Sequence, residues 1–229
     1  MFWMWREQKG IRQYLCQRDL KKSGRVLYND GIQTLLWRGD AIMSKFTQKV
    51  IMQTFLDILE HKSLDKITVK DIIETAEVNR NTFYYYFDDI YDLIDRIFEQ
   101  ELETVISEAK EESSFYEEYI RAASILIDHR QAIIHIYNSK SREILFDYMQ
   151  KTTDAFVVRF VRKAAADYDI SEEGVEFITY FYSSAIIGNT MRWLKDGMPF
   201  YREKLLKCIS DAFEATIDNM IGSYVKSGN

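Results

Sequence analysis

Apolar residues recur every three or four positions over most of the chain from residue 43 onward. In residues 43–60 this spacing is that of an amphipathic helix with one buried stripe. The stripe consists of Phe46, Val50, Ile51, Phe55, Ile58 and Leu59. The same spacing predicts further helices at 88–109, 115–127, 131–137, 142–167, 173–195 and 200–224. The chain is therefore predicted to be all-α.

Two short helices joined by a turn are predicted between residues 67 and 93. Thr68 and Asn79 are N-cap candidates, because their short side chains can accept the unpaired N–H groups of a helix start. The chain turns near 76–78, and an aromatic run at 83–87 follows the opening of the second helix. Two short helices around such a turn are the layout of a helix-turn-helix DNA reader. The second helix opens with Arg80, Asn81 and Thr82.

The composition agrees with long helices and argues against several other classes. One proline and nine glycines in 229 residues leave few points that interrupt a helix. Two cysteines and three scattered histidines form neither a disulfide framework nor a metal site, and no cofactor is predicted. No apolar run approaches the ~20 residues of a membrane span. These observations favour a reducing cytoplasm and no membrane partner.

The net charge of −6 argues against a general nucleic-acid coat protein. It leaves a sequence-specific reader open, because only the face that contacts DNA has to be basic. Ser183 and Ser184 lack a nucleophile elbow, and the chain has neither a Gly-rich phosphate loop nor an H-E-x-x-H site. An enzyme is therefore not predicted.

Residues 1–42 differ from the rest, with three of the four tryptophans and more basic than acidic side chains. Three interpretations stay open. The segment is a non-native upstream extension, the natural protein beginning at Met43; or it is a basic arm that touches DNA phosphates; or it binds a partner or a membrane surface peripherally.

Residues 43–98 resemble the DNA-binding domain of the TetR family of bacterial transcription regulators. The string T-V-K-D-I-I-E-T-A-E-V-N-R-N-T-F-Y-Y-Y-F from Thr68 to Phe87 carries the resemblance. Residues 180–199 resemble a C-terminal type common in regulators of low-GC Gram-positive bacteria, one branch of which controls dihydroxyacetone kinase genes. The resemblance implies a DNA-binding domain at 43–90 and a larger helical effector-binding and dimerisation domain at 91–229.

The resemblance also implies a homodimer that reads a palindromic double-stranded DNA operator, most often as a repressor. The last two long helices of each subunit would form the dimer interface. Gly188 in mid-helix suggests a close helix approach, at this interface or beside a ligand, unless the glycine is merely tolerated there. The residues expected to contact DNA are Thr68, Lys70, Asn79, Arg80, Asn81, Thr82, Tyr84 and Tyr85. Those expected at the dimer interface are Ile187, Gly188, Met191, Phe213 and Ile217.

Aromatic side chains in the larger domain are candidates for an effector pocket, although aromatic residues at helical spacing are more often ordinary core. The pocket candidates are His135, Tyr148, Tyr180 and Trp193. Two kinds of control stay open: a small-molecule effector, or a protein co-regulator that binds the C-terminal domain. A helical ligand-binding protein with weak or no DNA binding is a third alternative.

One departure from the resemblance bears on DNA affinity. Many family members carry a lysine where this chain has Ile90, and Asp88 and Asp89 beside it would repel DNA. Since phosphate contacts supply much of the affinity, weaker anchoring is predicted unless other cations compensate. The candidates for compensation are Lys45, Lys49, Lys66 and the basic residues before Met43.

Overall fold

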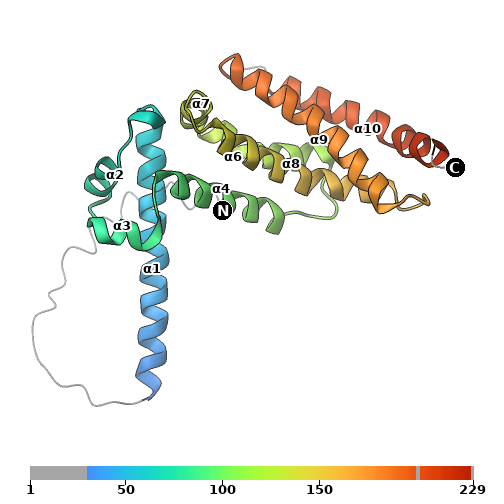
Figure 1. The fold of residues 1–229 in the computed structure, drawn as a ribbon. Coiled ribbons are helices and arrows are strands. Elements are labelled where there is room, and N and C mark those ends of the chain that lie inside the picture. The colour runs from blue at the N-terminus through green and yellow to red at the C-terminus, as the bar shows by residue number, and fades with distance from the viewer. Residues whose placement is uncertain (1–29, 200–201, 228–229) are drawn as a thin grey trace, which may run out of the picture. The chain divides into compact units, whose positions relative to one another are not determined.

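The computed structural model describes the backbone of residues 30–199 and 202–227 and the side chains of residues 45–199 and 204–225. Within these residues every regular element is a helix, and no strand occurs (Figure 1). The prediction of an all-α protein is confirmed. The basic residues up to 29, which a DNA-contacting arm would use, lie outside the described part.

The part predicted to read DNA consists of the last turns of α1, a short 3-10 turn and two short helices, and α4 follows it. The bounds are α1 (Asp30–Leu59), η3 (Leu64–Lys66), α2 (Val69–Ala76), α3 (Arg80–Tyr86) and α4 (Ile90–Ser107). The predicted first helix is thus longer at its start, because α1 begins at Asp30 rather than near Met43.

The remaining helices build the larger domain, in which α8, α9 and α10 run side by side (Figure 1). Their bounds are α5 (Phe115–Ala122), α6 (Ser124–Asp128), α7 (Arg130–Tyr137), α8 (Arg142–Ala164), α9 (Glu172–Lys195) and α10 (Arg202–Ser227). The helix predicted at 115–127 is divided at Ala123, which keeps near-helical backbone angles (φ −87°, ψ −3°). The predicted helix therefore lies where helices are found, but the structure has two helices, α5 and α6, in place of one.

Side-chain caps fix where the short helices begin. Thr68 accepts the N–H of Asp71 at 3.2 Å, and the Asp71 carboxylate accepts the N–H of Thr68 at 2.8 Å. This reciprocal pair is a capping box. Asn79 caps α3 by accepting the N–H of Thr82 at 2.8 Å. Both predicted N-caps are confirmed.

The helix after the aromatic run begins later than predicted, at Ile90 rather than at Asp88. Asp89 has an extended backbone, and its carboxylate accepts the N–H groups of Tyr91 and Asp92 at 2.7 and 2.9 Å. It is therefore the N-cap of α4, and its negative charge suits the positive end of the helix.

One apolar cluster runs from the short helices into the larger domain without a break at residue 90. Phe55, Phe83 and Phe87 are buried in it, and so are residues of α4, α7 and α8. Phe98 of α4 stacks on Tyr148 of α8, with 4.4 Å between ring centroids. Because packed cores resist gradual deformation, a movement of α4 would disturb its packing against α2, α3 and α8 in this cluster.

A second apolar cluster joins α5, α8, α9 and α10. The rings of Phe115 and Phe213 stack within it at 4.0 Å between centroids.

Among the described residues, no helix is both long and apolar enough to cross a bilayer. No group of three or more metal-ligating side chains is gathered in the part of the chain that the structure describes.

Candidate DNA interface

The aromatic run of α3 divides into an inner and an outer face. Phe83 and Phe87 are buried in the apolar cluster, whereas Tyr84 and Tyr85 are 45% and 77% exposed. Arg80 and Asn81 are exposed as well, at the start of the same helix. The outer face of α3 therefore presents donors and acceptors of the kind that read base edges and phosphates.

Arg80 and Tyr84 form one unit on this outer face. An Nη of Arg80 donates to the hydroxyl of Tyr84 at 3.3 Å, and the guanidinium lies 5.5 Å from the centre of the tyrosine ring. The ring restricts the arginine by stacking and by this hydrogen bond. An arginine held in this way loses less conformational freedom when it binds guanine O6 and N7.

The start of α2 is tied together by an internal network. Lys62 donates to the Asp71 carboxylate at 2.9 Å, and the Thr68 hydroxyl donates to the same oxygen at 2.7 Å. These hydrogen bonds lower the pKa of Asp71 from 3.8 to about 2. The Thr68 hydroxyl would have to leave Asp71 in order to donate to a phosphate. Lys70 is exposed, and its Nζ lies 3.7 Å from Glu74.

The start of α4, where many family members carry a lysine that binds phosphate, has apolar and acidic residues in this chain, and the structure gives a reason for each. Ile90 is half-buried and packs against the apolar cluster. Asp89 is engaged with backbone N–H groups of the first turn. The lysines named as candidates for compensation, Lys45, Lys49 and Lys66, are all exposed.

His135, a candidate for the effector pocket, lies on α7, and its ring contacts the C-terminal end of α1 instead. Its Nδ1 is 2.6 Å from the carbonyl oxygen of Leu59. Because a carbonyl oxygen only accepts, Nδ1 carries the hydrogen in this contact. His129 lies nearby, with 3.5 Å from its Nδ1 to Glu60. Two histidines thus join α6–α7 to the C-terminal end of α1.

Tyr148 and Trp193 line an interior cavity of about 30 Å³ between α5, α8, α9 and α10. This volume corresponds to about one water molecule. Burial raises the pKa of Tyr119, in the same lining, to about 12. Tyr180, the fourth pocket candidate, is 65% exposed on α9 and does not line this cavity.

The residues predicted at the dimer interface differ in how far they are buried. Ile187, Phe213 and Ile217 are buried within the chain's own core, so they cannot form the outer face of α9 or α10. Met191 is half-buried and Gly188 is exposed. A Cβ added at Gly188 would meet no atom within 4 Å. The chain itself therefore gives no steric reason for a glycine at this position.

An exposed strip of α9 was missed in the sequence, and we call it the α9 stripe. Phe177, Tyr180 and Phe181 are 49%, 65% and 49% exposed, and small residues continue the strip at helical spacing. Its members are Phe177, Tyr180, Phe181, Ser184, Ala185 and Gly188. The spacing was visible in the sequence, but α9 has apolar residues on several faces, so spacing alone does not say which face is covered.

Two family models match the chain. Residues 51–97 match the model for bacterial regulatory proteins of the tetR family, and residues 119–215 match a model for a transcriptional regulator C-terminal region. Together these ranges span more than half of the sequence.

Two relatives are named regulators. The chain is 26% identical over 147 residues to the HTH-type dhaKLM operon transcriptional activator DhaS of Lactococcus lactis, covering 64% of this chain and 79% of the relative. It is 24% identical over 133 residues to the uncharacterized HTH-type regulator YvdT of Bacillus subtilis, covering 53% and 69%. A solved structure named dihydroxyacetone kinase operon activator DhaS aligns with a TM-score of 0.61 at 25% identity, over 75% of this chain and 96% of that one.

Proposed function

Because the chain belongs to the TetR family of bacterial regulatory proteins, we propose that it is a homodimeric transcription regulator that reads an operator through α3. The exposed Arg80–Tyr84 unit carries this proposal. It offers a fixed guanidinium for guanine and a hydroxyl for phosphate. Asn81 stands beside Arg80 and can pair with adenine N6 and N7.

The proposed dimer forms through the α9 stripe. Exposed aromatic side chains at helical spacing are the kind of surface that a second copy covers. Gly188 lies in the same strip, where the absence of a side chain allows two helices to approach closely. A two-fold dimer presents its α3 helices to two half-sites about 34 Å apart, so the operator is expected to be palindromic.

The direction of regulation is a prediction from the family resemblance, which favours a repressor. The Lactococcus relative carries the name of an activator. A reporter gene fused to the promoter that contains the operator distinguishes repression from activation. Repression is supported when deletion of the regulator gene raises expression, and activation when deletion lowers it.

Control is proposed to act on the larger domain and to reach DNA through α4, which follows α3 directly and shares its apolar cluster. An effector has to bind two arrangements of α4 with different affinities in order to change operator binding. A partner protein is the second candidate for this role. It is favoured by the interior cavity of about 30 Å³, which leaves no room for a small molecule there.

Fluorescence anisotropy with DNA from the region upstream of the gene tests the function. We expect saturable binding that weakens with salt, because phosphate contacts release counterions. The protein with and without residues 1–42 is compared, so that a contribution of the basic segment shows as a steeper salt dependence. Absence of saturable binding by the folded dimer at low salt would overturn the proposal.

A further inference from the structure

A recess of about 360 Å³ lies between the C-terminal end of α4 and the middle of α8. We call it the α4–α8 recess. Its volume lies in the lower part of the range for small-molecule pockets. It is about an order of magnitude larger than the interior cavity of about 30 Å³. Its lining consists of Val105, Ile106, Ala109, Glu111, Ala155, Phe156 and Arg159.

The walls of the recess are apolar, and one cationic group stands among them. Ile106 is 56% exposed although it is a large apolar residue, so part of this wall faces solvent without a partner in the chain. Phe156 closes the recess on the α8 side and is buried. An occupant with an apolar body would cover the exposed part of Ile106 and remove this apolar surface from water, which is favourable.

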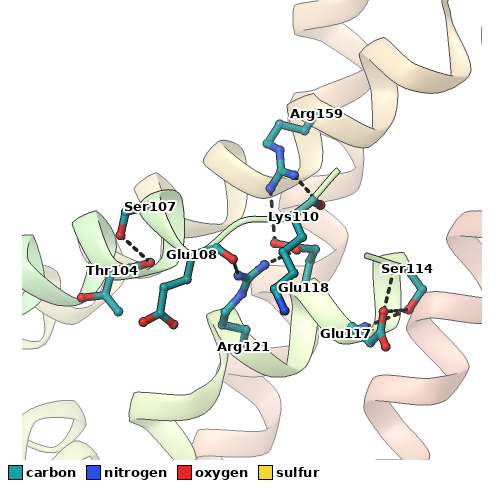
Figure 2. Close-up of polar contacts among 9 residues, drawn as sticks. All are labelled: Thr104, Ser107, Glu108, Lys110, Ser114, Glu117, Glu118, Arg121 and Arg159. Atoms are coloured by element: carbon teal, nitrogen blue, oxygen red, sulfur yellow. Dashed lines mark hydrogen bonds and ion pairs between the residues drawn. The ribbon is translucent and has the colours of Figure 1, made fainter. Parts of the chain in front are cut away.

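Arg159 is held in a fixed position by a buried acid. It donates to Glu118 at 3.3 Å and to the carbonyl oxygen of Lys110 at 3.0 Å (Figure 2). Glu118 is 0% exposed and also pairs with Arg121, which donates to the carbonyl oxygen of Glu108 (Figure 2). One buried carboxylate therefore orients two guanidinium groups, and each of them binds a carbonyl just beyond the end of α4.

The charges of this network favour an anion in the recess. Arg159 is the cation of the recess lining, and it shares the Glu118 carboxylate with Arg121, so its positive charge is only partly neutralised. Arg159 has five N–H donors, of which these contacts use two, and its side chain is 37% exposed. Glu111 carries the opposite charge, but it is exposed and therefore screened by water. A carboxylate bound to the guanidinium of Arg159 can form two parallel hydrogen bonds.

We propose that the α4–α8 recess binds a small organic acid, with its carboxylate on Arg159 and its apolar body against Ile106 and Phe156. This inference rests on the proposed function, since it names the ligand class and the site through which the larger domain is controlled. The acid uses the N–H groups of Arg159 that Glu118 and Lys110 leave free, and it draws the guanidinium toward the recess, which weakens the hydrogen bond from Arg159 to the Lys110 carbonyl. Binding therefore loosens the segment after α4, and the change reaches α3 along α4.

The first experiment measures binding of a charge series by isothermal titration calorimetry. Hexanoate is the probe, and hexanol and hexylamine have the same chain without the negative charge. We expect saturable binding of hexanoate, at least about tenfold tighter than either control. No saturable binding of hexanoate, or equal binding of hexanol, would overturn the inference.

Three variants locate the site. Arg159→Gln removes the cation and should weaken hexanoate binding at least about tenfold, whereas Arg162→Gln, one turn further along α8, should leave it unchanged. Ala155→Phe fills the recess and keeps the Arg159–Glu118 pair, so it tests the site even where Arg159→Gln reduces folding. Unchanged hexanoate binding in a folded Ala155→Phe protein would place the acid elsewhere and refute the site.

Hydrogen exchange and DNA binding then test the consequence for α4. Hexanoate should speed amide exchange in residues 108–113 and change operator affinity in the wild type, but neither in Ala155→Phe. Protein that binds DNA but not hexanoate overturns this inference and leaves the proposed function standing. Protein that binds hexanoate in the recess but does not bind DNA overturns the proposed function and leaves the acid site standing.

Discussion

Arg80 and Tyr84 are the residues on which recognition is expected to depend most. Their hydrogen bond and their stacking contact hold the guanidinium on the outer face of α3 before DNA arrives. Neither contact follows from the sequence spacing alone, although positions i and i+4 of a helix face each other. Tyr85, at 77% exposed, has freer surroundings.

Arg80→Ala is expected to weaken specific operator binding by roughly 1–3 kcal/mol, since it removes a bidentate base contact. Tyr84→Phe keeps the ring under Arg80 and removes only the hydroxyl, so a smaller loss is expected. Fluorescence anisotropy on operator and scrambled DNA measures both. Arg162→Ala on α8 is the matched control. Equal losses for Arg80→Ala on the two DNAs would mean a phosphate contact instead of base reading.

Asp71 makes the stability of the folded state depend on pH in a way that can be tested. Its pKa is about 2 in the folded chain, below the ordinary 3.8, because Lys62 and Thr68 donate hydrogen bonds to its carboxylate. The folded state thus binds this proton more weakly than the unfolded state, so the stabilisation is complete above about pH 4 and is lost as the pH falls toward 2.

Asp71→Asn should therefore lower the Tm at pH 6 and flatten the fall in Tm between about pH 4 and pH 2. Thermal melts followed by circular dichroism over this range check the shape of the curve. Asp65→Asn, an exposed aspartate in the preceding 3-10 turn, serves as the control. A parallel downward shift at every pH would show that the side chain acts without its charge.

At the scale of elements, the join between α4 and α5 depends on Glu118. This acid is completely buried and lies between Arg121 and Arg159, which bind the carbonyls of Glu108 and Lys110. Both carbonyls belong to the segment just after α4, which ends at Ser107. The two arginines therefore attach this segment to α5 and α8, and the acid fixes both arginines.

Glu118→Gln leaves two arginines without their counter-charge. We expect a loss of about 3 kcal/mol in the free energy of unfolding, toward the low end for a broken buried pair because Arg159 is partly exposed. Urea denaturation at a fixed protein concentration measures it, since a dimer's stability depends on concentration. Glu112→Gln, an exposed neighbour, should have little effect. Similar unfolding free energies for both variants would contradict this role of Glu118.

At the scale of the whole molecule, the α9 stripe is the surface expected to pair two subunits. Gly188→Leu and Phe181→Asp should each raise the dimer dissociation constant at least about tenfold, because one lost aromatic anchor or one blocked approach costs more than about 1.4 kcal/mol. Sedimentation velocity measures the shift. Lys163→Leu on α8 adds the same side chain at an exposed position as a control. Unchanged dimers in both variants would move the interface away from α9.

The helices and their caps could be predicted from the sequence, because both depend on residues only a few positions apart. The period of the apolar positions located the α3 face with Phe83 and Phe87 inward, and the short polar side chains of Thr68 and Asn79 marked helix starts. The Ser114–Glu117 capping box at the start of α5 has the same kind of local signal and could have been found.

Contacts between distant residues were decided by the tertiary structure. Arg159 is 41 positions from Glu118, and His135 is 76 positions from Leu59, so no local spacing connects them. Which face of α9 stays exposed could likewise not be predicted, because apolar residues surround most of this helix. The sequence by itself determined an all-α fold and a short helix that begins at Arg80 with Phe83 and Phe87 on its inner face. Only packing decided that Ile187, Phe213 and Ile217 are buried in the core, while Phe177, Tyr180 and Phe181 stay exposed on α9.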